Sequence, residues 1–448
     1  MTIISSYPLR FVKYPYKQYD KIFRDTMGQY RGAVDFLIPV CIENAEKLSK
    51  YQYMNDKQRA VELMVHITAK NPNPKYHFDE RFKKFPSYLR RAATCAAIGL
   101  AESYLSNLRN WKNGGKKGKQ PNVPKAGNIF PVFYKDASYE EVGEYIYRIK
   151  VFINNTWDWI TLPVRKSDAD YISRHCKGKK RMSPHLQKNG KIWSLVFTFE
   201  EKVTLDKTPV QKQVILAVDL GINNACACAA MKSDGTVIGK EFLHLPVEED
   251  SLTHALNKLK KAQRLNAFHT PRLWARVNGI NDCIASRTAQ FIVNTAIKYG
   301  ATTIVFEYLE KKGKKRGGKK QRLHLWKSQK VQAIVTHRAH HFGMHVAHVN
   351  AWNTSGLAFD GSGYVKRGQK ADLPSYSLCR FSTGKIYNCD LNASYNIGAR
   401  FFIREILKSC SETERLVIEA KVPQCTKRST STLSTLISLN AVIVASAA

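Results

Sequence analysis

The stretch QVILAVDLGINNACACAAMKSDGTVIG, residues 213–239, decides how the second half of the chain folds. Its first aliphatic run ends at Asp219, and two further apolar segments follow the short turns GINN and KSDG. This pattern predicts three strands in an antiparallel meander. A carboxylate at the end of a strand that is apolar on both faces costs free energy unless a helix N-terminus, a basic side chain or a metal ion neutralises it.

The charge balance indicates a polyanionic partner. The 448 residues include 71 Lys and Arg against 36 Asp and Glu, a formal net charge of +35. Such an excess repels itself without an anion, so nucleic acid is the first expectation. A membrane would require a basic amphipathic helix or a hydrophobic anchor, and because the sequence shows neither, we expect no membrane partner. The ten cysteines lack a framework spacing, which is typical of the reducing cytoplasm.

The periodicity of the remaining sequence predicts an α+β protein of two or three domains. Apolar residues recur at helical spacing from about Tyr19 to Lys50, whereas residues 128–204 alternate as antiparallel strands do. After the meander, a long helical region runs from about Ser251 to Tyr299 and ends at a glycine. Strands and helices then alternate, so we expect a mixed α/β sheet in this half.

Three acidic residues recur in the same local context. Asp219 ends the first strand of the meander, Glu307 ends the apolar strand TTIVFE, and Asp390 opens the helix DLNASYNIG. Each alone is weak evidence, because a helix-opening Asp is usually a cap or a first-turn charge and a strand-end Glu is usually solvated. If the two strands are neighbours and the helix packs on their sheet, however, the three carboxylates converge at one edge.

Converging carboxylates predict divalent metal ions. Three such groups cannot all stay ionised without cations between them, and hard Mg²⁺ or Mn²⁺ suits an all-oxygen ligand set. Two such ions support phosphodiester hydrolysis, since one activates water and the other stabilises the leaving oxygen. We therefore expect Asp219, Glu307 and Asp390 to hold two Mg²⁺ or Mn²⁺ ions and to act on a phosphodiester.

The segments VDLGINN, IVFEYL and CDLNASYNIG resemble, in order and spacing, the three motifs of RuvC-type nuclease domains with the ribonuclease H-like fold. More narrowly, the chain is similar to the transposon-encoded RNA-guided nuclease TnpB and the miniature type V CRISPR nucleases. The family's catalytic acids fall on Asp219, Glu307 and Asp390. The resemblance implies an endonuclease that cuts DNA beside a short adjacent motif. It implies a guide RNA, target double-stranded DNA and its displaced single strand as partners, in a prokaryotic cytoplasm at the nucleoid, with monomer and dimer both open.

The same resemblance divides the chain into domains. It implies a β-barrel wedge domain, an N-terminal helical recognition lobe and a RuvC nuclease domain that contains a degenerate zinc-ribbon-like insertion. The C-terminal tail is apolar but broken by Ser, Thr and Asn, so we expect it to be poorly ordered. In the same order, the boundaries are 1–18 with 120–206 for the wedge, 19–119 for the lobe, 207–420 for the nuclease domain, 350–389 for the insertion and 421–448 for the tail.

The zinc ribbon that the family usually carries is incomplete here. Ala358 and Gly361 stand where the first cysteine pair would fall, and only Cys379 and Cys389 remain near the second. Two cysteines do not close a zinc site, so we expect no structural zinc. Hydrophobic packing is expected to hold the insertion instead. His337 and His341 share a helix face and could be metal ligands, but the sequence places no third ligand near them. The expected packing residues are Trp352, Leu357, Phe359, Tyr376 and Phe381.

Basic clusters are the predicted nucleic-acid contacts. The run KKGKKRGGKKQR, residues 311–322, begins just after Glu307, and we interpret it as a lid that gathers the substrate strand. A Gly- and Lys-rich loop and the polar side of the preceding helix supply further cations. The predicted contacts are Lys311, Lys312, Lys314, Lys315, Arg316, Lys319, Lys320, Arg322, Lys116, Lys117, Lys119, Arg90 and Arg91.

Two other functions fit the sequence. One is a guide-RNA-dependent DNA-binding regulator or transposition accessory protein with weak or no cleavage, which the presence of all three acids argues against. The other is a guide-free nuclease that acts on branched or single-stranded DNA. The large basic N-terminal half argues against this second alternative, because it is difficult to explain without an RNA partner.

Overall fold

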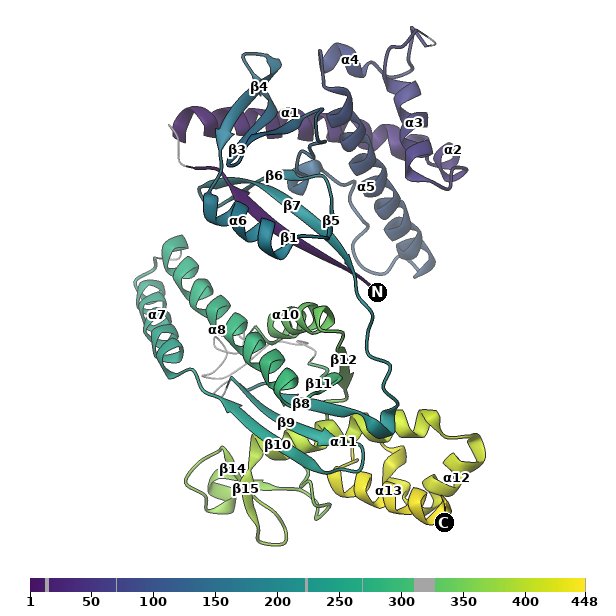
Figure 1. Cartoon of the computed structure of the whole chain (residues 1–448), viewed down its shortest axis with the longest axis vertical. Helices are drawn as coiled ribbons and strands as arrows, with labels where there is room; N and C mark the ends of the chain where they lie inside the picture. The colour runs from purple at the N-terminus through teal and green to yellow at the C-terminus, as the bar shows by residue number, and fades with distance from the viewer. Residues whose placement is uncertain (13–15, 70, 222–224, 268, 310–326, 448) are drawn as a thin grey trace. The chain divides into compact units, whose positions relative to one another are not determined.

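The computed structural model describes the chain except for residues 13–15, 70, 222–224, 268, 310–326 and 448 (Figure 1). The described chain divides between Glu201 and Lys202 into two units. The N-terminal unit comprises Thr2–Glu201, and the C-terminal unit comprises Lys202–Ala448 together with Met1. Hydrophobic clusters form within each unit, so each one has its own core.

The N-terminal unit combines amphipathic helices with antiparallel strands. Its longest helices are α1 and α5, and α5 follows Pro86, whose fixed backbone suits a helix start. The strands β2, β3 and β4 form one antiparallel sheet, and β7 pairs with β1, β5 and β6 in another. The elements are β1 (Thr2–Arg10), α1 (Tyr16–Glu43), α2 (Ala45–Ser49), α3 (Met54–Val65), α4 (Phe78–Arg81), α5 (Ser87–Asn113), η1 (Ala126–Asn128), β2 (Tyr139–Gly143), β3 (Ile146–Ile153), β4 (Thr156–Pro163), α6 (Lys166–His175), β5 (Lys180–Arg181), β6 (His185–Asn189) and β7 (Ile192–Lys202).

Helices and strands of this unit share one hydrophobic core. Phe23 of α1 lies with its ring centre 5.2 Å from that of Trp193 on β7, and Phe85 lies 5.0 Å from Trp157 on β4. All four side chains are buried. The predicted helical lobe and β-rich domain therefore form one compact unit rather than two, because aromatic side chains from both are buried against one another.

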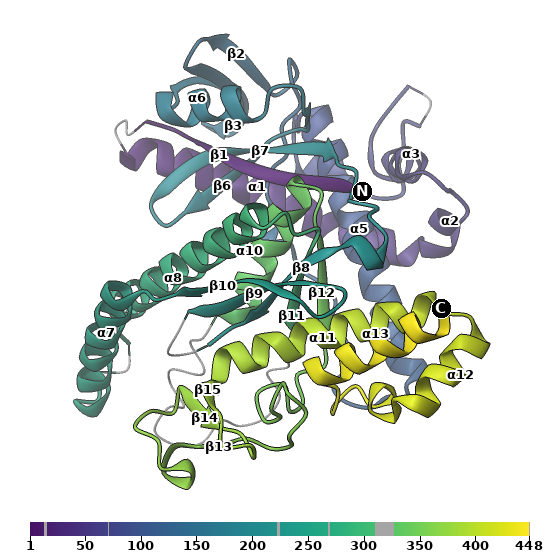
Figure 2. The same ribbon diagram turned by 60° about the horizontal axis from the view of Figure 1, so that its bottom comes forward.

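A five-stranded mixed sheet organises the C-terminal unit. Its order is β10-β9-β8-β11-β12, and Figure 2 shows the strands side by side. The antiparallel pairs β8–β9 and β9–β10 confirm the predicted meander, while β11 pairs in parallel with both β8 and β12. The predicted mixed α/β architecture is therefore confirmed. The strands are β8 (Val214–Asp219), β9 (Cys226–Lys232), β10 (Val237–Leu243), β11 (Thr303–Glu307) and β12 (His345–Val349).

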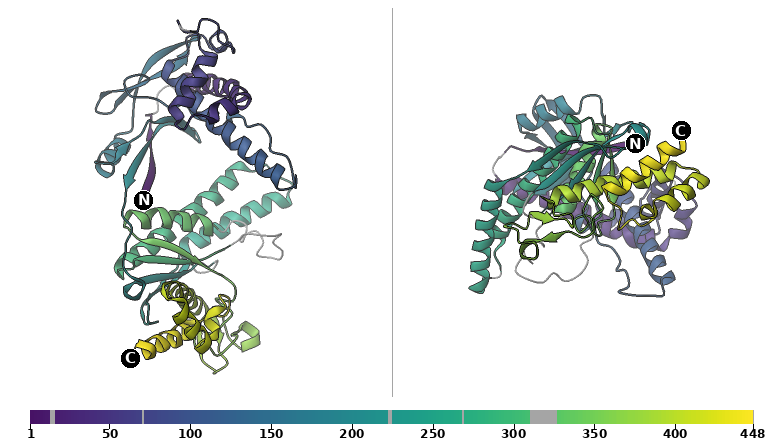
Figure 3. Two further views of the ribbon diagram at one scale, coloured as in Figure 1. Left: turned by 90° about the vertical axis from the view of Figure 1, so that its right-hand side faces the viewer. Right: turned by 90° about the horizontal axis from the view of Figure 1, so that it is seen from below.

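Helices cover both faces of this sheet. Apolar side chains of α8 and α10 form one cluster with the sheet, and side chains of α11 and α13 form another on the opposite face. In the left view of Figure 3, the sheet separates the green helices from the yellow ones. The helices and short turns are η2 (Val210–Lys212), α7 (Pro246–Arg264), α8 (Pro271–Lys298), α10 (Ser328–His341), η3 (Gly368–Ala371), α11 (Cys389–Ser409), α12 (Glu412–Lys421), η4 (Pro423–Thr426) and α13 (Leu433–Ala447).

The helical region predicted between Ser251 and Tyr299 consists of two helices. Helix α7 ends at Arg264, and Asn266 adopts a positive φ of 57° that an α-helix does not accommodate. Pro271 then occupies the first turn of α8, where its missing N–H costs nothing. Gly300, with φ of 63°, ends α8 as predicted.

Helix α11 lies unusually close to the sheet. A Cβ atom on Gly398 would come within 3.1 Å of Met231 Sδ and 3.3 Å of Ala217 Cβ, so only glycine fits without displacement. Met231 and Ala217 belong to β9 and β8. This close approach brings the N-terminal turn of α11 to the strands that carry the acidic residues.

The prediction of a poorly ordered tail at 421–448 is wrong. Helix α13 packs on α11, and Leu433, Leu436 and Leu439 are buried in their shared cluster. The spacing of these leucines makes one apolar stripe, which the intervening Ser and Thr residues obscured in the sequence. No helix in the described part of the chain, α13 included, is long and apolar enough to cross a membrane.

The packing of α13 predicts an unequal cost for two neighbouring truncations. Leu436 is fully buried, whereas Ile437 is 52% exposed. We expect Leu436→Ala to lower the free energy of unfolding by about 2–5 kcal/mol and Ile437→Ala to lower it by less than about 1 kcal/mol. Chemical denaturation of both variants measures the difference, and equal values would show that α13 does not stabilise the unit.

Candidate catalytic site

The structure brings the three predicted carboxylates to one edge of the C-terminal sheet. Asp219 and Glu307 are the last residues of β8 and β11, which pair in parallel with Val218 opposite Phe306. Asp390 lies in the first turn of α11, which packs on β8. All three side chains are half-buried. The carboxyl ends of adjacent parallel strands are where α/β proteins commonly place their sites.

Electrostatic repulsion connects the three acids. Burial raises the pKa of Asp219 well above its usual range, and the negative charges of Glu307 and Asp390 raise it further. Arg367 acts in the opposite direction but does not cancel the effect. Asp219 therefore resists ionisation in the absence of added positive charge.

Glu307 is held by a hydroxyl and faces a buried guanidinium. Burial raises its pKa, while a hydrogen bond from Thr354 Oγ1 to Glu307 Oε1 and the charge of Arg400 lower it. Burial lowers the pKa of Arg400 to about 10, against the opposing influence of Glu307. Arg400 nevertheless donates to the carbonyls of Asn350 and Trp352 at 2.8 and 2.7 Å, so its position is fixed from several sides.

The helix that carries Asp390 is capped by a different residue. Asn388 Oδ1 accepts hydrogen bonds from the backbone N–H groups of Asp390 and Leu391 at 2.9 and 3.0 Å. Asn388 thus performs the capping role that a helix-opening Asp often has. The Asp390 carboxylate is therefore not required as the N-cap of α11.

Two buried asparagines attach the segment beside Glu307 to α11. Asn392 accepts from the Phe359 N–H and donates to the Leu357 carbonyl, both at 2.8 Å. Asn396 donates to the carbonyls of Thr354 and Leu357, both at 2.9 Å. Because Thr354 bonds Glu307, these amides link the position of Glu307 to the helix that carries Asp390.

Sequence reasoning missed the polar residues that surround the acids. Thr354 lies in irregular backbone and Arg367 in the two-residue strand β13, and the sequence did not reveal the fold of either. Arg400 and the two asparagines could have been found, because polar residues inside the otherwise apolar helix sequence are unusual and need partners when buried. Their buried hydrogen bonds fix the framework that holds Glu307 and Asp390.

The carboxylates suit a hard divalent cation by chemistry and charge. Carboxylate oxygens are the ligands that Mg²⁺ and Mn²⁺ prefer, and a cation relieves the repulsion that raises the pKa of Asp219. Among the residues that the structure describes, no three His, Cys, Asp or Glu side chains are arranged as a complete set of metal ligands. The acids therefore offer suitable donors without a preformed ligand shell.

The predicted zinc-ribbon remnant has a small core of its own. Cys379 and Cys389 are buried with Ala358 and Phe381, beside a three-stranded sheet of β13 (Lys366–Arg367), β14 (Leu378–Arg380) and β15 (Ile386–Asn388). Their mutual hydrogen bond lowers the pKa of Cys379 and raises that of Cys389. The absence of structural zinc stays a prediction.

Packing holds this segment only in part as predicted. Leu357 and Phe381 are buried, and Phe359 packs against Phe381, but Trp352 and Tyr376 are 69% and 74% exposed. The last two side chains were therefore wrongly assigned to the core. His337 and His341 lie on α10 with ring centres 4.9 Å apart.

The predicted nucleic-acid contacts differ in what the structure says of them. Lys116, Lys117 and Lys119 are exposed, whereas Arg90 is 6% exposed and pairs with Glu62 at 3.4 Å. The assignment of Arg90 to a nucleic-acid surface is wrong, because its charge is already buried and paired. Arg91 is exposed over the ring of Tyr88. The predicted lid residues Lys311, Lys312, Lys314, Lys315, Arg316, Lys319, Lys320 and Arg322 lie outside the described residues.

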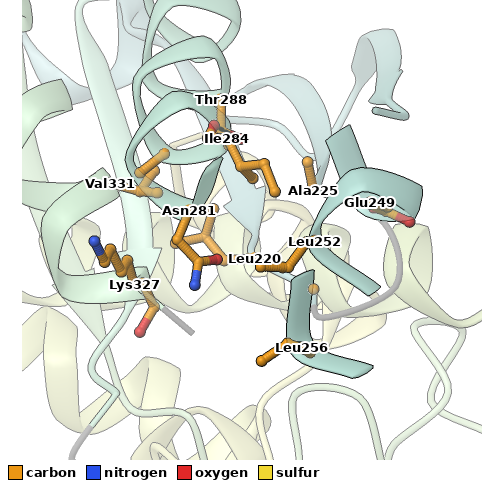
Figure 4. A pocket seen from close by; sticks show the side chains of 13 residues that line it. Leu220, Ala225, Glu249, Leu252, Leu256, Asn281, Ile284, Thr288, Lys327 and Val331 are labelled. Carbon is orange, nitrogen blue, oxygen red and sulfur yellow. Dashed lines mark hydrogen bonds between the residues drawn. The ribbon is translucent and has the colours of Figure 1, made fainter. Parts of the chain in front are cut away.

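A cavity of about 60 Å³ lies beside Gly221, at the end of β8 (Figure 4). Its walls are mostly apolar, but among the described residues the buried Asn281 Nδ2 and Ser328 Oγ have no hydrogen-bond partner. A space of this size has room for water molecules. It is too small for a nucleotide, and bound water is the simplest partner for the two polar atoms.

Three comparisons relate the chain to known proteins. Residues 9–153 match the model of the Aq_aa04 family. The chain is 26% identical over 241 residues to the TnpB-like protein aq_aa05 of Aquifex aeolicus (strain VF5), which covers 49% of this chain and 77% of the relative. The structure of the mini-RNA-guided endonuclease CRISPR-Cas_phi3 is 9% identical with a TM-score of 0.53, covering 89% of this chain and 92% of that one. A Cas12f1-sgRNA-target DNA complex covers 88% of this chain and 98% of that one at 16% identity, with a TM-score of 0.33.

The fold is thus shared with the structure described as the mini-RNA-guided endonuclease CRISPR-Cas_phi3. The chain is similar to a TnpB-like protein, as the resemblance of its three motifs predicts.

The raised pKa of Asp219 predicts a pH-dependent stability difference between the metal-free protein and its Asp219→Asn variant. A raised pKa favours the protonated acid in the folded state, so this contribution is present below the ordinary value of 3.8 and is lost as pH rises through the raised value. We expect Asp219→Asn to be the more stable protein at neutral pH, by about 1.4 kcal/mol for each unit by which the pKa is raised.

Denaturation of both proteins across the pH range, with a chelator present, measures this difference. Added Mg²⁺ should reduce it at neutral pH, because the cation stabilises the ionised acid of the wild type. A difference that does not change with pH would contradict the raised pKa of Asp219.

Proposed function

We propose that the protein is an RNA-guided, metal-dependent DNA endonuclease of the RuvC type. The observation that carries this proposal is the placement of Asp219, Glu307 and Asp390 at one sheet edge, where burial and then the charges of the other two acids raise the pKa of Asp219. A purely structural group of acids would avoid such repulsion. A site built for divalent cations requires it.

The comparisons and the charge support the guide RNA and the DNA. The chain is similar to a TnpB-like protein and shares its fold with a structure described as a mini-RNA-guided endonuclease. The strand order with α11 against β8 agrees with a ribonuclease H-like domain. A net charge of +35 suits a guide duplex and a target strand, which together carry many phosphates. We place this activity in a bacterial cytoplasm, at the nucleoid.

Each residue near the edge has a proposed role. Asp219, Glu307 and Asp390 would hold two Mg²⁺ or Mn²⁺ ions, which would activate water and stabilise the leaving oxygen. Thr354 donates its hydroxyl hydrogen to Glu307 Oε1 and so orients this carboxylate. Arg400 offsets part of the negative charge from within the protein.

The N-terminal unit and the exposed basic loops are proposed to bind the RNA and the duplex. Residues 1–18 with 120–206 are proposed to act as the wedge and 19–119 as the recognition lobe, and Thr2–Glu201 of these form one compact unit. Lys116, Lys117, Lys119 and Arg91 are the proposed contacts there, and the basic run 311–322 is proposed as the substrate lid. These side chains are proposed to contact the phosphate backbone of the nucleic acid, so they set the affinity of binding rather than its sequence preference.

Cleavage assays with matched carboxylate variants test this proposal. Asp234 is exposed in the turn between β9 and β10, at the edge of the sheet opposite to Asp219. We expect Asp219→Asn to lower the rate of Mg²⁺-dependent DNA cleavage on the order of 100-fold or more and Asp234→Asn to leave it unchanged. The measurement uses protein purified with its bound RNA and a DNA target that matches the guide.

The bound RNA separates this proposal from its alternatives. Sequencing should find a defined RNA that ends in a variable guide, and Asp219→Asn should retain it. Random bound nucleic acid, or cleavage that does not depend on the guide, would favour a guide-free nuclease. A defined RNA without any Mg²⁺-dependent cleavage would indicate a binding protein instead.

A further inference from the structure

A basic cavity of about 460 Å³ opens at the carboxyl ends of β11 and β12. Tyr308, which directly follows Glu307, and Asn350, which directly follows β12, line one side of it. Helices α11 and α12 and the segment after η4 form the rest. The cavity therefore lies at the same edge of the sheet as the candidate catalytic acids.

Arg400 links this cavity to the candidate catalytic acids. Its guanidinium lines the cavity and also acts on the pKa of Glu307. It donates to the carbonyls of Ser429 and Ser431 at 3.0 and 3.1 Å, and so attaches the C-terminal wall to α11. The C-terminal segment, residues 425–431, thus forms the wall of the cavity that faces α11.

The charge of the lining is strongly positive. Five cations line the cavity: Arg400, Arg404, Lys408, Arg415 and Arg428. Two carboxylates oppose them, since Glu419 lines the cavity and Glu405, beside it, accepts hydrogen bonds from Arg404 and Lys408. Arg428 is exposed and forms no ion pair within the described residues. Five cations against two carboxylates attract an anion into the cavity.

The remaining lining suits a nucleotide rather than a bare anion. Ile403 and Leu407 provide apolar surface, and the Tyr308 side chain is 61% exposed at the rim. An exposed aromatic ring beside a basic groove is typical of single-strand binding, where base stacking contributes about 1–3 kcal/mol. A cavity of this size admits one nucleotide unit of a strand but not a double helix.

We propose that this cavity binds a nucleotide of single-stranded DNA next to the phosphodiester that reaches Asp219, Glu307 and Asp390. Its phosphate contacts Arg404 and Arg428, and its base packs on Tyr308. The inference rests on the proposed function, because it assigns the bound strand to the substrate of that site. It adds a strand-holding role for the C-terminal segment.

Photocross-linking with a cleavage-inactive protein tests this assignment. The full-length Asp219→Asn protein is mixed with a short oligodeoxythymidylate that carries one 5-iodouracil, and the cross-linked peptide is identified by mass spectrometry. We expect cross-linking to the peptide that contains Tyr308. We expect its loss when Arg404→Gln and Arg428→Gln are added, and its retention with Lys212→Gln and Lys421→Gln, two exposed lysines outside the cavity.

The salt dependence of binding gives a second readout. The slope of log K against log salt for single-stranded DNA is negative, and loss of two phosphate contacts should reduce its magnitude by about 1.4 in the cavity variant and leave it unchanged in the control. Arg404 also donates a hydrogen bond to the His348 carbonyl, whereas Arg428→Gln alone removes no internal hydrogen bond within the described residues and should reduce the magnitude by about 0.7.

Three results would overturn the inference: unchanged cross-linking in the cavity variants, equal slope changes in the control, or stronger cross-linking of an RNA oligomer of the same sequence. None of these depends on cleavage. Cross-linking at Tyr308 in a protein that shows no guided cleavage would therefore reject the proposed function and retain the cavity, and the opposite outcome would reject the cavity alone.

Discussion

Repulsion among three carboxylates at one sheet edge is the constraint on which the C-terminal unit depends. Asp219 and Glu307 lie close together because β8 and β11 pair in parallel, and the first turn of α11 places Asp390 beside them. Nothing in strand pairing or helix packing relieves the resulting negative charge. Arg367 and Arg400 offset only part of it, since the pKa values of Asp219 and Glu307 are still raised. The unit therefore accepts a local cost in stability, as proteins commonly do where a site must attract cations.

A buried polar framework prevents this repulsion from separating the elements. Asn392 and Asn396 attach the segment 354–359 to α11, and Arg400 attaches residues 350, 352, 429 and 431 to the same helix. These groups are buried and their bonds are to backbone atoms, so each bond lost would leave an unsatisfied polar atom. The C-terminal residues complete this framework, since the Leu433 N–H also donates to Asn396. The position of Glu307 thus depends on hydrogen bonds that extend as far as residue 433.

The sequence predicted the acids and the sheet because their signals are local. Aliphatic runs that end in Asp219 and Glu307, and the turns of the meander, each lie within a few residues. Thr354 and Arg367 could not be predicted, because the irregular backbone of Thr354 and the two-residue strand of Arg367 take their positions from distant partners. Arg90 was misassigned because a cation on a helix looks the same in sequence whether it faces solvent or Glu62. Two features are present in the sequence but were missed. The helical pattern on either side obscured the break before Pro271, and the Ser and Thr residues obscured the leucine stripe of α13.

The distribution of charge imposes an order on binding. At physiological ionic strength, charges are screened over about 8 Å, so the net charge of +35 attracts a polyanion to the surface but does not cancel three acids at close range. A phosphate that approached Asp219, Glu307 and Asp390 without cations would meet further repulsion. The basic cavity lined by Arg404 and Arg428 lies at the same edge and has the opposite sign. In the function and cavity proposed above, a strand would therefore be held first by the cavity and would reach the acids only when divalent ions had made that position favourable. Attraction and chemistry would then lie on adjacent but separate groups, joined through Arg400.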